Sequence, residues 1–232
     1  MPALTSLEIE TLELSLRVGL VSVAASLPFG IAVAWLLARR QFPGKILLDG
    51  LVHLPLVLPP VVVGYGLLVL FGRNGPIGTW LYDVFGVTFA FNWKGAALAS
   101  GAMAFPLMVR AMRLSLELVD RRLEAAARTL GAGRARVFLT ITVPLMAPGI
   151  LTGAILGFAR SISEFGATIT FVSNIPGETR TLPLALYALT QVPGGDAAAW
   201  RLALLSVLLA MAALIASELL ARRLDRRIRG VA

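Results

Sequence analysis

The stretch LEAAARTLGAGRARVFLTITVP, residues 123–144, is polar and rich in arginine, yet apolar runs of membrane-spanning length lie on both sides of it. Its first half carries apolar residues at i, i+3, i+4 and i+7, a spacing that predicts a short helix with one apolar face. The residues of this face are Leu123, Ala126, Ala127 and Leu130. Because so short a loop cannot bury that face, the pattern predicts a surface for a soluble partner.

Signals for helix ends flank the same segment. Asp120 is a suitable N-cap, and Gly131 together with Gly133 provides a stop and a turn. A second segment, Val137–Val143, leads through Pro144 into the next apolar run. We therefore expect a compact helix-turn-helix that lies in water and is anchored in lipid at both ends.

The composition is that of a membrane protein. Of 232 residues, 57% are hydrophobic and 15% are charged, with a mean hydropathy of +0.82. A soluble domain carries about a quarter charged residues. Uncharged runs of about 20 residues are long enough to span a bilayer as helices. An all-α polytopic membrane protein is predicted from the runs 18–38, 50–72, 137–159 and 202–217, with a shorter one at 95–109.

The net charge of +8 follows topology and does not suggest nucleic acid. Basic residues cluster after the first span, around residues 110–136 and in the tail 222–229, whereas the start carries Glu8, Glu10 and Glu13. The positive-inside rule places such basic connections in the cytoplasm. This predicts an N-terminus outside and a C-terminus inside, with about five transmembrane helices.

Several classes of function lack the residues they need. An acidic start before a full-length apolar run predicts no cleavable signal peptide, and a cysteine count of zero excludes thiol chemistry. The sequence has no G-x-x-x-x-G-K-[ST] loop and no recognisable triad or metal cluster, so we expect no enzyme, no catalytic residue, no metal and no cofactor in this chain. His53 in the second span is expected to be a buried, hydrogen-bonded group, with a metal ligand as the less favoured alternative.

Turn residues divide the apolar runs into spans and external loops. Pro55, Pro59 and Pro60 predict a bend in the second span. The loop Gly72–Lys94 carries an aromatic segment typical of a membrane interface, and the loop Val172–Asp196 contains an apolar stretch. The five expected spans are Leu14–Ala38, Ile46–Phe71, Gly95–Arg113, Met146–Phe171 and Ala198–Ala221.

The fourth span contains two unusual patterns. Gly149, Gly153 and Gly157 recur every four residues, which favours close helix packing within the subunit over a dimer seam. Arg160 and Glu164 lie one turn apart where unpaired charges cost several kcal/mol. Two interpretations stay open. The two charges form a lock within the bundle, or they border a translocation path together with Ser161 and Ser163.

The polar segment resembles the EAA loop of ABC-importer permeases, whose pattern is EAA, three residues, Gly, nine residues and I-x-L-P. Counting back from Ile141 and Pro144 places the motif glycine at Gly131. The same count places the motif glutamate at position 125, which is Ala125, so Glu124 lies one residue early. A shift of one residue turns a side chain by about 100° around a helix. The resemblance implies that ATPase coupling involves Leu123, Glu124, Ala126, Ala127, Leu130, Gly131, Ile141 and Pro144.

Other motifs resemble the molybdate permeases of the type I importer family. They are FPGK at 42–45, HLPLVLPPVVVGY at 53–65, FPLMVRA at 105–111 and EFGATITFVSNIPGETRTLP at 164–183. The resemblance implies a type I ABC-importer transmembrane domain over residues 10–220 with its coupling loop at 120–144. It further implies a homodimer in the bacterial inner membrane that imports molybdate by alternating access, with two cytoplasmic ATPase subunits that bind the ATP and a periplasmic or lipid-tethered molybdate-binding protein.

Three alternatives differ in class or substrate. The EFGA portion is also similar to sulfate and thiosulfate permeases, and tungstate is a further tetrahedral dianion. A secondary transporter would predict an inverted repeat, and none is evident. A non-transporting scaffold or signalling partner would not need an ATPase, so an ATPase gene beside this one would separate it from a transporter.

Overall fold

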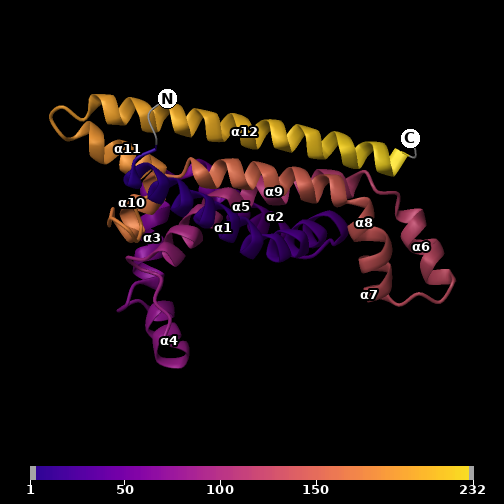
Figure 1. Cartoon of the computed structure of the whole chain (residues 1–232). Helices are drawn as coiled ribbons and strands as arrows, with labels where there is room; N and C mark the ends of the chain where they lie inside the picture. Colours follow the sequence, from indigo (N-terminus) through magenta and orange to yellow (C-terminus); the bar gives the residue numbers. More distant parts are fainter. Residues whose placement is uncertain (1–3, 230–232) are drawn as a thin grey trace.

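The computed structural model describes residues 4–229, and within that range all regular structure is helical (Figure 1). The elements in chain order are α1 Ser6–Arg39, α2 Lys45–Val57, α3 Pro60–Phe71, α4 Pro76–Phe85, α5 Trp93–Glu117, α6 Arg121–Thr129, α7 Arg134–Val137, the π-helix η1 Phe138–Thr142, α8 Val143–Leu145, α9 Ala147–Ile162, α10 Gly166–Val172, α11 Leu182–Thr190 and α12 Asp196–Arg229.

Up to five membrane spans are present among the described residues. α1, α5 and the first 21 residues of α12 are each long and apolar enough to cross a membrane. Two further spans are bent pairs of helices, α2 with α3 at 116° and the α7–α8 segment with α9 at 66°. The expected all-α architecture with about five spans is therefore confirmed at its upper count.

The bend in the second span lies where proline chemistry predicts it. Leu58 precedes Pro59 and adopts an extended backbone, as steric contact with the proline ring requires. Pro60 then opens α3, where its missing N–H and fixed φ are tolerated.

The fourth span differs from the expected single helix Met146–Phe171. α9 ends at Ile162 and a separate helix, α10, begins at Gly166. At the break, the Glu164 carboxylate accepts the Ala167 N–H at 2.8 Å. In a continuous helix this N–H would instead donate to the carbonyl of Ser163. Gly166 also lies so close to α3 that a Cβ there would be 2.8 Å from Pro60 Cβ.

The core is formed by α1, α5 and α9 packed against one another. The glycines of α9 face α5, and a Cβ on Gly157 would lie 2.7 Å from Met108 Cγ. Gly153 would meet the Met108 carbonyl oxygen at 3.0 Å. The small-residue stripe therefore packs inside the subunit, as its spacing predicted.

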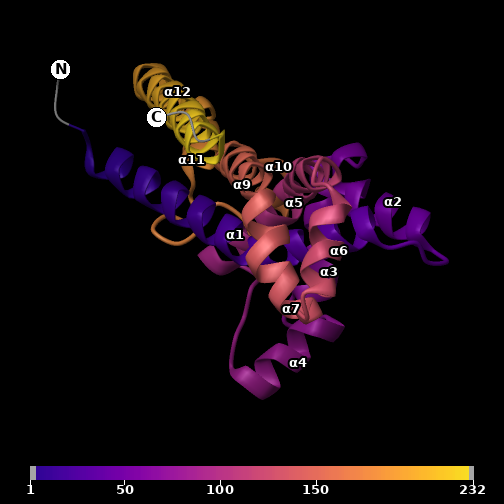
Figure 2. The same ribbon diagram turned by 90° about the vertical axis from the view of Figure 1, so that its right-hand side faces the viewer.

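The elements outside the core include α12, the hairpin helices α6 and α7, and α4. α12 runs along α9, and its C-terminal end lies at the same end of the molecule as α6 and α7 (Figure 1). Viewed from that end, α6 and α7 are close to the viewer and project from the bundle (Figure 2). α4 projects from the bundle in both views and exposes Trp80 and Tyr82, as expected for an interfacial aromatic segment.

Candidate functional site

The predicted hairpin forms, and its ends are capped as expected. The Asp120 carboxylate accepts the Arg122 N–H at 2.8 Å. At the other end Gly131 adopts φ +86°, and the Ala132 N–H donates to the Ala127 carbonyl at 3.0 Å. This is the Schellman arrangement, in which a residue with left-handed backbone satisfies the last carbonyls of a helix.

α6 has two chemically different faces. Leu123 and Leu130 are 50% and 88% exposed, Ala126 is exposed and Ala127 is half-buried. About 160° around the helix, given 100° per residue, lie Arg121, Glu124, Ala125 and Arg128. Three of the four residues of the apolar face are exposed, which suits a docking surface, and the role of this face in coupling stays a prediction.

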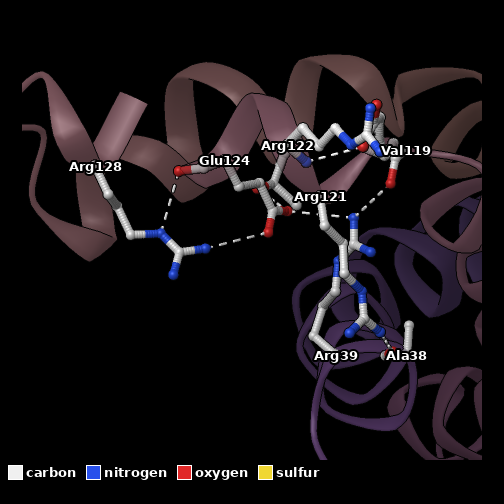
Figure 3. Close-up of polar contacts among 9 residues, drawn as sticks. Ala38, Arg39, Val119, Arg121, Arg122, Glu124 and Arg128 are labelled. Carbon is white, nitrogen blue, oxygen red and sulfur yellow. Dashed lines mark hydrogen bonds and ion pairs between the residues drawn. The ribbon is translucent and has the colours of Figure 1, made fainter. Parts of the chain in front are cut away.

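The glutamate of the hairpin is turned inward (Figure 3). The Glu124 side chain is 9% exposed and forms an ion pair with Arg39 at the end of α1, at 3.3 Å. Its second oxygen lies 3.6 Å from the Arg128 guanidinium, and Thr142 Oγ1 donates to the first at 2.9 Å. Arg39 also donates to the Val119 carbonyl at 3.1 Å. Glu124 thus joins three elements of one subunit and does not lie on the apolar face.

The second arm of the hairpin contains a π-helix. η1 brings Thr142 to Glu124, and the aromatic rings of Phe138 and Trp35 meet edge to face at a centroid distance of 6.1 Å. π-helical turns are rare and occur frequently at functional sites. Ile141 is half-buried and Pro144 is exposed at the start of α8.

The second candidate site is the break between α9 and α10. Arg160 and Glu164 form an ion pair at 2.6 Å, with side-chain exposures of 26% and 1%. The other oxygen of Glu164 accepts the Ala167 N–H. The predicted neutralising pair is therefore confirmed as a contact, and Arg160 is its more accessible member.

The two neighbouring serines point to different environments. Ser161 is buried, and its Oγ lies 2.8 Å from Ser22 Oγ on α1. Ser163 is exposed and donates its hydroxyl to the Arg160 carbonyl at 3.1 Å. Of the four residues proposed to border a path, only Arg160 and Ser163 are accessible within the single subunit.

The long-range partners of the charged residues are not predicted by the sequence. Arg39 belongs to the basic cluster after the first span, and its place at the end of that span is the signal that connects it to the hairpin. Asp49 of α2 binds Arg113 of α5 at 2.9 Å, and this contact had no sequence signal. His53 is hydrogen-bonded to the Asp49 carbonyl at 2.9 Å, as predicted, but it is half-buried and not fully buried.

Comparison with solved structures shows that the fold is that of the transmembrane domain of a type I ABC importer. The crystal structure of a bacterial ABC transporter involved in the import of the acidic polysaccharide alginate matches with a TM-score of 0.74 over 95% of this chain and 80% of that chain, at 17% identity. At that identity the match supports the fold alone.

The chain belongs to the family of binding-protein-dependent transport system inner membrane components, whose profile matches residues 26–230. It is a multi-pass inner-membrane permease component and not itself an enzyme. It is 65% identical over 219 residues to the molybdenum transport system permease protein ModB of Escherichia coli K12, covering 94% of this chain and 96% of that protein. The corresponding protein of Haemophilus influenzae is 57% identical over 222 residues, covering 96% of this chain and 97% of that protein.

Proposed function

We propose that this chain is the permease subunit of an ATP-driven importer that moves molybdate across the inner membrane by alternating access. The observation that carries the proposal is the 65% identity with a molybdenum permease over nearly the full length of both proteins. Sulfate, thiosulfate and tungstate are the competing substrates, because tetrahedral dianions differ mainly in radius and the EFGA motif at Glu164 resembles sulfate permeases as well.

The working complex we propose is a homodimer with two cytoplasmic ATPase subunits and a periplasmic or lipid-tethered molybdate-binding protein. The exposed apolar face of α6 supports ATPase docking, since ATP must be bound by a partner. No residue of α2 is fully buried in the single subunit, although the helix is apolar and Leu48 and Val52 pack against the core, and this supports a second permease copy.

The proposed orientation places residue 6 outside and residue 133 inside. It can be tested with single cysteines, because the natural chain has none. Cysteines at positions 6, 74 and 178 are expected to react with an impermeant thiol reagent added outside, and cysteines at 42 and 133 to react only after the membrane is opened. Reaction of position 133 from outside would contradict both the orientation and the coupling role of the hairpin.

Transport is tested by reconstituting the permease with its cognate ATPase and binding protein in proteoliposomes. Uptake of radiolabelled molybdate is expected to require ATP on the hairpin side and to be reduced by excess unlabelled molybdate. Tungstate, sulfate and thiosulfate are added in parallel as competitors. If labelled sulfate is taken up and excess unlabelled molybdate does not reduce this uptake, the substrate is sulfate and not molybdate.

A further inference from the structure

A cavity of about 480 Å³ lies between the end of α1 and the hairpin, and no role described above uses it. Trp35, Phe138 and Thr142 form part of its wall. The charged part of the wall holds five arginines and one carboxylate, from Arg39, Arg40, Arg121, Arg128, Arg134 and Glu124. Five positive charges and one negative charge leave this arginine pocket with a formal excess of four positive charges.

The single carboxylate of the arginine pocket is already engaged. Both Glu124 oxygens have partners, in Arg39, Thr142 and Arg128. Arg39 is 8% exposed at its side chain, and its Nε is buried without a hydrogen-bond partner in the part of the chain that the structure describes. A buried donor without a partner costs about 1–3 kcal/mol, and the excess positive charge of the wall favours an added anion.

The arginine pocket lies on the opposite side of α6 from the proposed docking face. Ala125 and Arg128 line the pocket, whereas Leu123 and Leu130 point away from it. An ATPase seated on the apolar face therefore leaves the pocket to another ligand. The position of the pocket relative to the membrane also matters. Trp35 lies one turn before the end of a membrane-spanning helix, where aromatic residues are enriched, so the pocket lies at the level of the lipid headgroups.

We propose that the arginine pocket binds the phosphate group of an anionic phospholipid of the cytoplasmic leaflet. Guanidinium groups match phosphate oxygens in a bidentate geometry, and basic pockets beside helices on the cytoplasmic side suit anionic headgroups. The bound lipid would fix the inner face of α6 at the membrane surface while its outer face holds the ATPase. This inference rests on the orientation proposed above and not on which anion is transported.

The test uses the purified complex of permease and ATPase and counts bound lipid by native mass spectrometry during titration with phosphatidylglycerol or phosphatidylcholine. In the double variant Arg40→Gln/Arg134→Gln two pocket charges are removed, neither of which contacts Glu124 in the structure. Each basic residue near the membrane surface contributes about 1 kcal/mol, so phosphatidylglycerol affinity should fall about thirtyfold. The matched control Arg122→Gln/Arg136→Gln removes the same charge outside the pocket wall and should retain the lipid.

A second variant keeps the arginines of the pocket and fills its volume. Ala125→Trp should fill the arginine pocket and also lose phosphatidylglycerol, while ATPase co-purification through the opposite face continues. Equal binding of phosphatidylcholine by the wild type, or equal losses in the two double variants, would overturn the proposal. Displacement of the lipid by millimolar inorganic phosphate would also overturn it, since the pocket would then be a site for soluble anions.

Discussion

The hairpin and the α9–α10 break each bury a glutamate against an arginine, but they do so over different distances in the sequence. Glu164 meets Arg160 one turn away and accepts a backbone N–H three residues on. Glu124 instead reaches Arg39 on α1 and Thr142 on η1. The first arrangement shapes a single span, whereas the second fastens a projecting element to the bundle.

This difference indicates that the two regions have separable tasks. The hairpin has an exposed apolar face and is held to α1 by polar contacts on its inner face, and in the proposed complex this would connect the ATPase to α1. The break has its charges satisfied locally, so its loss should disturb the bundle before it disturbs any partner. Substitutions that affect one region and spare the other would sharpen this comparison.

The largest effect is expected on the outer face of α6. Ala127→Asp places a charge in the apolar docking surface, and Gly131→Pro cannot adopt the required φ of +86°. Both should abolish ATPase co-purification and transport while the permease still inserts. The matched control Ala125→Asp introduces the same side chain on the arginine-lined face and should keep the ATPase. A full complement of ATPase on both variants would show that docking lies elsewhere.

The ion pair at the break should give the next largest effect. Arg160→Gln strands the Glu164 carboxylate, whose side chain is 1% exposed, a loss of about 3–5 kcal/mol, whereas Glu164→Gln leaves the more accessible Arg160 and should cost less. The double variant should recover much of this stability in thermal unfolding of the purified complex. If it recovers stability and transport, the pair is a lock beside the path. If it assembles normally and fails to transport, Arg160 attracts the anion.

A smaller effect is expected at the inner face of the hairpin. Glu124→Gln removes the ion pair with Arg39 and the charged hydrogen bond from Thr142, at about 2 kcal/mol, and should raise amide hydrogen exchange across residues 121–129. The control Glu117→Gln removes the ion pair between Glu117 and Arg113. Because the Glu117 side chain is 45% exposed, this substitution should change stability by less than about 1 kcal/mol. Unchanged exchange in the Glu124 variant would argue against the fastening role of this residue.

The serines should give the smallest effects. Ser161→Ala removes one buried hydrogen bond to Ser22 and should cost about 1 kcal/mol of stability. Ser163→Ala affects an exposed hydroxyl and should leave stability unchanged. Loss of molybdate uptake in the Ser163 variant at normal stability would place that hydroxyl on the path.

Much of the fold follows from local patterns. Apolar runs locate the spans, prolines predict a bend in the second span, and Asp120 with Gly131 marks the ends of α6. The Arg160–Glu164 pair was predictable too, because helical geometry alone brings residues i and i+4 together. The roles assigned to the coupling residues remain predictions.

By itself the sequence determined everything that depends on helix period and chain continuity: the spans, the caps, the apolar face of α6 and the local ion pair. Only the tertiary structure decided that Glu124 faces Arg39, that Asp49 meets Arg113 and that α9 stops at Ile162. The first two contacts depend on how separate helices pack. The end of α9 depends on which acceptor binds the Ala167 N–H. Periodicity fixes the side of a helix on which a residue lies, but it does not fix which helix lies opposite.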